Sequence, residues 1–159
     1  MYRIKSTSLK GNYTLFKNEE QFSEVIYNNW KLNHAQASYL QQAIEIKVNA
    51  DQKNQHDIIK NGATIGHISI DRKLVPHIEV LDQHHKKQRF HLKQEGFWRY
   101  KYVLCFSNPE APAIVLQSNI KRLTTYYDIE KISATPLNIE VPELVIYSIY
   151  ALNLLGSYA

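Results

Sequence analysis

The fold is decided by residues 142–156, PELVIYSIYALNLLG. Proline suits the first turn of a helix and glycine the position just past its end, so this stretch predicts a helix over about 142–155. Its interior polar side chains are Ser148 and Asn153, too few for the polar face that a surface helix turns to water. A helix of this composition must be enclosed.

Two enclosures are open to such a helix, a lipid bilayer and a protein core, and its length separates them. At about 1.5 Å per residue, roughly 13 helical residues span about 20 Å, whereas the bilayer core of about 30 Å needs ~20 apolar residues. No lysine or arginine lies beside the helix, as often happens at a membrane span. The sequence therefore favours a buried helix and predicts no transmembrane segment.

Two tyrosines of the helix, Tyr147 and Tyr150, lie three residues apart. Tyrosines can stack on nucleic-acid bases, but in an enclosed helix they should pack against the surrounding wall. Their hydroxyls would then reach the backbone of that wall or water. The sequence accordingly predicts no nucleic-acid partner.

Before the helix, apolar and polar residues alternate in short runs, the pattern of strands with one buried face. Ile44–Val48 is the clearest run. In 98–106 the even-numbered residues, largely aromatic, should face the core. The expected strands lie near 2–7, 12–17, 22–28, 35–40, 44–48, 55–60, 63–70, 75–82, 86–94, 98–106, 111–118 and 123–132.

The connections between these runs are short. Asn61-Gly62 is the preferred pair for a two-residue hairpin turn. Between Tyr27 and Gln42 the pattern is weaker, and a short helix is an alternative there. Because no connection has room for a crossover helix, the sheet should be largely antiparallel. We therefore expect a mainly β fold: a closed or nearly closed barrel of about twelve strands around the C-terminal hydrophobic helix.

Length and composition bound the class of protein. The 159 residues are the size of one domain, so we expect a single barrel domain over 1–159. The net charge of +4 permits an anionic partner without requiring one. The lone Cys105 cannot form an internal disulfide, and Met1–Ser6 lacks the apolar segment of a secretory signal. Both features favour a cytoplasmic setting.

Three features together resemble a known superfamily: the helix Pro142–Leu155, the phrase Asn61–Gly66, and Phe90-His91-Leu92 followed by Gly96–Tyr102. Their order is similar to that in the tubby C-terminal domain, the phospholipid scramblases and the LURP-one-related proteins. The resemblance implies a twelve-stranded barrel around a central hydrophobic helix. The chain lacks the proline-rich or cysteine-rich extension and the acidic calcium loop of scramblases, so it is most similar to the short single-barrel members.

The strongest candidate for a binding site is basic. If Glu95-Gly96-Phe97 is a three-residue hairpin loop, Lys93 lies opposite Arg99, His91 opposite Lys101 and Arg89 opposite Val103 on one outer face. Such cations could contact the phosphates of an anionic lipid headgroup. The alternation resembles the tubby lipid site, which implies a lipid-binding role for Arg99 and Lys101 in particular. The alternative is an ordinary solvated strand face. The candidate ligand-binding residues are Arg89, His91, Lys93, Arg99 and Lys101.

The sequence gives less support for a catalytic or metal site than for the basic face. The histidines show no zinc-ligand spacing, and neither a Gly-x-Ser-x-Gly phrase nor a phosphate-binding glycine loop is present, so we expect no metal, no cofactor and no catalytic residue. A hydrolase would need His77, Glu79 and His91 together in one pocket. They can meet only if their strands are neighbours.

We therefore expect a non-enzymatic binding or scaffold domain, cytoplasmic and in peripheral contact with anionic membrane phospholipid. The alternatives are a structural or protein-interaction domain without a small ligand and, less favoured, a hydrolase. Because the helix should fill the barrel, any binding site is expected on its outside.

Overall fold

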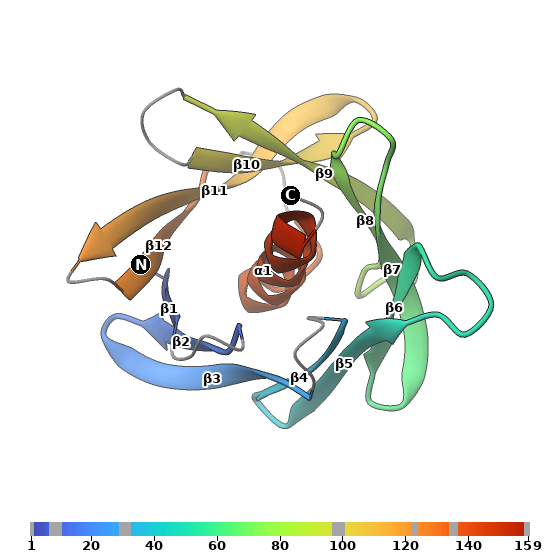
Figure 1. The fold of residues 1–159 in the computed structure, drawn as a ribbon, viewed down its shortest axis with the longest axis horizontal. Helices are drawn as coiled ribbons and strands as arrows, with labels where there is room; N and C mark the ends of the chain where they lie inside the picture. The colour runs from blue at the N-terminus through green and yellow to red at the C-terminus, as the bar shows by residue number, and fades with distance from the viewer. Residues whose placement is uncertain are drawn as a thin grey trace.

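The computed structural model describes residues 2–6, 11–28, 33–96, 101–121, 124–133 and 137–157. Within them, twelve strands curve into a closed barrel around one helix (Figure 1). The elements are β1 (Tyr2–Ser6), β2 (Tyr13–Lys17), β3 (Glu20–Tyr27), β4 (His34–Tyr39), β5 (Gln42–Val48), β6 (Gln55–Lys60), β7 (Ala63–Ile70), β8 (Pro76–Leu81), β9 (Lys87–Glu95), β10 (Lys101–Ser107), β11 (Glu110–Lys121), β12 (Thr124–Lys131) and α1 (Val141–Ser157).

Every strand pairs antiparallel with its neighbours along the chain, and β1 pairs with β12 to close the ring. At this closing pair Tyr2 lies opposite Ile129, and Arg3 Nε donates a hydrogen bond to Asp128 Oδ1 at 2.8 Å. Closure removes the free strand edges that invite aggregation. The expected fold class, a mainly β antiparallel barrel of about twelve strands around a C-terminal helix, is confirmed.

The helix α1 runs through the middle of the barrel (Figure 1), and inward-facing side chains such as Leu15, Ile46 and Phe90 form the core around it. Its residues from Pro142 to Ala151 are all buried. The helix is therefore enclosed, as expected. Its C-terminal end differs from the prediction, which placed Gly156 just past the helix. Gly156 lies inside the last turn without a positive φ, and Ser157 Oγ donates to the Leu154 carbonyl at 2.6 Å.

Tyr147 and Tyr150 are fully buried against the wall, as predicted. The Tyr150 ring stacks on Tyr27 with 5.8 Å between centroids, and its hydroxyl lies 2.6 Å from Nδ1 of the buried His56. The Tyr147 hydroxyl donates to Glu143 Oε2 at 3.2 Å. Both hydroxyls thus bond to side chains, partners that the sequence analysis did not predict.

The tight turns follow their residue types. Asn61 and Gly62 both have positive φ, 51° and 84°, which confirms the two-residue hairpin between β6 and β7. In the weakly patterned region, β3 continues to Tyr27 and β4 occupies His34–Tyr39, so strands replace the alternative helix there; residues 29–32 lie outside the described part of the chain.

The pairing of β9 with β10 differs from the expected one. Lys101 lies opposite Glu95, Val103 opposite Lys93 and Cys105 opposite His91. Among the described residues β9 ends at Glu95 and β10 begins at Lys101, and residues 97–100 between them lie outside the described part of the chain. The predicted pairs of His91 with Lys101, Arg89 with Val103 and Lys93 with Arg99 were therefore wrong.

The helix begins at the end of the barrel that carries the turns at 40–41, 61–62 and 82–86. No helix among the described residues combines the length and the apolar composition needed to cross a bilayer.

Candidate functional site

The predicted basic face lies on the outside of the barrel, on β9 and β10. Arg89, His91 and Lys93 alternate along β9 with the inward-facing, buried Phe90 and Leu92. Lys101 begins β10 on the same outer side, opposite Glu95. Arg99 lies outside the described residues. Four of the five predicted residues thus share one face.

Each of these four side chains is paired with a carboxylate. Arg89 Nε donates to Glu79 Oε2 at 2.9 Å, and Lys101 Nζ lies 3.7 Å from Glu95 Oε2. Both Lys93 Nζ, at 2.6 Å, and His91 Nε2, at 3.3 Å, contact Glu110 Oε1. The acidic partners were missed because they come from strands other than β9 or from its end. A phosphate group would have to compete with carboxylates already in place.

The carboxylates on this face are held ionised by their neighbours. The hydrogen bonds from Lys93 and His91 lower the pKa of Glu110. Partial burial opposes the ionisation of Glu79, but the contacts from Lys87 and Arg89 outweigh it and lower the pKa of Glu79. This surface is therefore a set of alternating charges rather than a uniformly positive patch.

The residues of the hydrolase alternative do come together. His77 lies directly opposite His91 on adjacent strands, with 6.2 Å between ring centroids, and both line a shallow groove of about 510 Å³ with Glu79. Glu79, however, is engaged by Lys87 and Arg89, and His77 Nε2 lies 2.8 Å from Asp71 Oδ2. Glu79 is thus engaged by two cations, and one ring nitrogen of His77 is engaged by a carboxylate.

A second set of contacts on the same face has the residue types of a serine-hydrolase triad. Ser107 Oγ lies 2.9 Å from His91 Nδ1, and Glu110 Oε1 lies 3.3 Å from Nε2. In the catalytic triad the roles of the two ring nitrogens are the reverse, with Nε2 accepting the serine proton and Nδ1–H facing the carboxylate. The geometry therefore does not favour acyl transfer.

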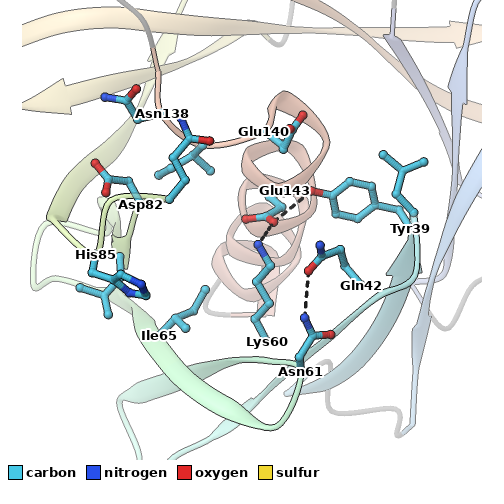
Figure 2. Close-up of a pocket in the computed structure, with 14 residues that line it drawn as sticks. Tyr39, Gln42, Lys60, Asn61, Ile65, Asp82, His85, Asn138, Glu140 and Glu143 are labelled. Carbon is cyan, nitrogen blue, oxygen red and sulfur yellow. Dashed lines mark hydrogen bonds and ion pairs between the residues drawn. The ribbon is translucent and has the colours of Figure 1, made fainter.

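A better-enclosed recess lies at the end of the barrel where α1 begins (Figure 2). It has a volume of about 430 Å³ and lies between the β4–β5, β6–β7 and β8–β9 turns and the segment that leads into the helix. Its polar lining side chains are Tyr39, Gln42, Lys60, Asn61, Asp82, Gln83, His85, Asn138, Glu140 and Glu143.

The floor of the recess is an ion pair between a buried carboxylate and a partly exposed lysine. Glu143, in the first turn of α1 and only 3% exposed, accepts hydrogen bonds from Lys60 Nζ and from the Tyr39 hydroxyl at 3.0 Å on Oε1 (Figure 2). The Tyr147 hydroxyl donates to its other oxygen. Burial, reinforced by the charge of Glu143, raises the pKa values of Tyr39 and Tyr147, so both remain hydrogen-bond donors.

The rim of the recess is fixed by side chains that bond to backbone. Asn61 Oδ1 accepts from the Ala43 amide at 2.8 Å while its Nδ2 donates to Gln42. Asp82 Oδ1 accepts from the amides of His84 and Lys86, at 2.8 and 2.9 Å. Burial opposes the ionisation of Asp82, but these bonds and one from Gln88 lower its pKa. The rim is therefore rigid and partly anionic.

Sequence reasoning missed the recess, and Glu143 is the residue that could have revealed it. A carboxylate in the first turn of a helix that must be enclosed needs a buried partner, because an unpaired buried charge is costly. The sequence therefore contained a signal for a cation on the wall. Which lysine supplies it depends on the strand register, which the sequence does not specify.

The charged side chains that line the recess are one lysine, Lys60, and three carboxylates, Asp82, Glu140 and Glu143; His85 also lines it. Glu140 is exposed at the rim. Apart from His85, this lining carries more negative than positive charges. No protein-family model, curated protein or solved structure matches this chain.

Proposed function

We propose that the protein is a non-catalytic binding domain that takes a small polar ligand carrying an amino group in the recess at the start of α1. The observation that carries this proposal is the lining: three carboxylates and one lysine, which is already paired, converge on a recess of about 430 Å³. That volume is in the usual range for small-ligand sites.

Electrostatics favours a cation over an anion in this recess. A helix N-terminus by itself attracts negative charge, but here Glu143 already occupies the first turn. Lys60 is neutralised by Glu143, so an incoming carboxylate or phosphate would face Asp82 and Glu140 without a free cation from this set. An ammonium group would meet those carboxylates and the amide oxygens of the rim.

The test compares ligands that differ only in the charged group. Butylamine and butyrate are titrated into the protein while amide chemical shifts are followed by NMR. We expect shift changes around the recess with butylamine only. Glu140→Gln should weaken butylamine binding by about two- to fivefold, the size expected for an exposed ion pair. The matched control, Glu130→Gln on β12, should not. Equal responses to both ligands, or shifts elsewhere, would contradict the proposal.

A second candidate function is contact with anionic membrane lipid at the outer face of β9, in a cytoplasmic protein of the tubby and scramblase-like superfamily. It is supported by the barrel-around-helix architecture and by the exposure of Lys87, Arg89 and Lys93, whose side chains are 57%, 66% and 48% exposed. Because carboxylates balance these cations, the expected adsorption is weak and strongly salt-dependent.

Vesicle sedimentation tests this candidate with phosphatidylserine-containing and pure phosphatidylcholine vesicles. The double change Arg89→Glu/Lys93→Glu should abolish adsorption to the anionic vesicles. Arg72→Glu/Lys73→Glu, which makes the same charge change in the β7–β8 loop, should leave it in place. Adsorption that survives the first change would exclude the lipid face. Failure of both the amine and the vesicle tests would favour a structural or protein-interaction domain.

A further inference from the structure

Three side chains on consecutive strands bring unlike donor atoms together on the outer wall. His91 lies on β9, Cys105 on β10 directly opposite it, and Glu110 at the start of β11. One nitrogen, the sulfur and one carboxylate oxygen of this group all lie within 4.8 Å of one another. The donors are supplied by paired strands, which hold side chains more precisely than loops do.

The separations are close to those of ligands on a single tetrahedral ion. Zinc binds histidine nitrogen and carboxylate oxygen at about 2.0–2.2 Å, so two such donors at a tetrahedral angle lie about 3.3–3.5 Å apart. His91 Nε2 and Glu110 Oε1 are 3.3 Å apart. A sulfur bound at about 2.3 Å would lie about 3.5 Å from the other two donors, so the Cys105 sulfur, within 4.8 Å of a His91 nitrogen and a Glu110 oxygen, has to approach them by about 1.3 Å at most.

The other nitrogen of His91 has the support that a metal-bound histidine usually has. Nδ1 lies 2.9 Å from Ser107 Oγ. When Nδ1–H donates to this hydroxyl, Nε2 carries its lone pair toward Glu110, and a cation between the two is the natural complement. Metal-ligating histidines characteristically fix their tautomer through such a second hydrogen bond.

We propose that His91 Nε2, the Cys105 thiolate and the Glu110 carboxylate bind a divalent transition-metal ion, with zinc as the fitting member of the series. Nitrogen, sulfur and oxygen donors together suit zinc, and three protein ligands leave a fourth position for water or a ligand. On binding, the Cys105 S–H bond breaks, sulfur bonds to the metal, and the proton passes to solvent. This site is separate from the recess at the start of α1.

Lys93 is the competitor for this site. Its ammonium group lies 2.6 Å from Glu110 Oε1, the oxygen that would bind the metal. The lysine side chain is half-exposed, so it can turn into solvent when the metal enters. Replacing this lysine by a neutral residue should therefore tighten metal binding, which an incidental histidine on the surface would not do.

The test uses tag-free protein titrated with Zn²⁺, and with Co²⁺ as a spectroscopic substitute. We expect one tight ion per chain, a sulfur-to-cobalt charge-transfer absorption, and release of the cysteine proton. Cys105→Ser should remove the absorption and weaken Zn²⁺ binding by more than tenfold. Ser107→Ala should weaken it by about tenfold through the histidine. Lys93→Gln should bind more tightly than the unaltered protein.

The matched control is His67→Gln, because this histidine lines the same shallow groove as His91 without belonging to the three proposed ligands. It should bind Zn²⁺ like the unaltered protein. The proposal is overturned if the cobalt complex shows no thiolate absorption, or if Cys105→Ser or Glu110→Gln binds as tightly as the original. Should Cys105→Ser fail to fold, the cobalt spectrum and Lys93→Gln still decide the question.

Discussion

Removing Lys60 should destabilise the protein more than removing the charge of its partner Glu143. In the Lys60→Met variant the carboxylate remains 5% exposed at the start of α1 with its cation gone. Breaking a fully buried pair in this way costs about 3–5 kcal/mol. Hydrogen bonds from Tyr39 and Tyr147 remain, at 3.0 and 3.2 Å, and Lys60 is 28% exposed, so we expect about 2–3 kcal/mol.

Glu143→Gln is the milder change. The amide keeps the volume of the carboxylate and can still accept the Tyr39 hydrogen bond, while the Lys60 ammonium can turn toward water at the recess. We expect a loss of about 1 kcal/mol. The double variant Lys60→Met/Glu143→Gln should be no less stable than Lys60→Met alone, because the unpaired buried charge is gone.

Urea unfolding at neutral pH measures all three variants, with the slope of the transition used to check that unfolding stays two-state. The control is Lys47→Met, which removes a solvent-exposed lysine 3.8 Å from Glu45 and should cost less than about 0.5 kcal/mol. Two results would refute this account: Glu143→Gln loses as much stability as Lys60→Met, or the loss in the double variant equals the sum of the losses in the two single variants.

Three further predictions concern the barrel itself. Gly66→Ala should lower the free energy of unfolding, measured in urea, by about 3 kcal/mol or more, because a Cβ there would lie 2.0 Å from the Glu79 carbonyl oxygen. Gly156→Ala should raise it by about 0.5–1 kcal/mol, because a Cβ at this helical position meets nothing within 4 Å. Burial lowers the pKa of His56 below its ordinary 6.5, so the stability that neutral His56 contributes is present above about pH 6.5 and is lost as pH falls through the lowered value. His56→Gln should therefore lose less stability than the original between about pH 7 and 5, and an unchanged slope would count against this assignment. Deleting residues 143–159 removes the core of the barrel, so circular dichroism and gel filtration should show no folded monomer; a compact truncated protein would contradict the enclosed-helix fold.

The elements that the sequence predicts well are those with local causes. The helix follows from an unbroken apolar run, and the hairpin from Asn61-Gly62, whose conformational preference needs no distant partner. The predicted β9–β10 register was wrong because the alternation of apolar and polar residues does not encode the length of the connection between two strands. In the observed pairing the residue opposite each lysine is shifted by four positions, an even number, so Lys93 and Lys101 keep the outer face while their opposite residues change.

Which residues meet at each site depends on the strand register, so the sites could not be predicted from the sequence. His91 and Cys105 are 14 positions apart in sequence and become direct neighbours only through the β9–β10 pairing. A register irregularity between Leu104 and Cys105 then sets where Glu110 falls relative to them. Lys60 and Glu143, separated by 83 positions, likewise meet only because the helix enters the barrel at this end.

The closing pair of β1 and β12 has a consequence for how the chain is made. A ribosome releases β1 about 120 residues before its partner, so the ring stays open while hairpins accumulate from the N-terminus. The apolar inner wall also has nothing to cover it until α1, which follows every strand, has been synthesised. Folding of the whole barrel is therefore a late event that waits for its last element, and the nascent chain is most vulnerable to aggregation just before that helix emerges.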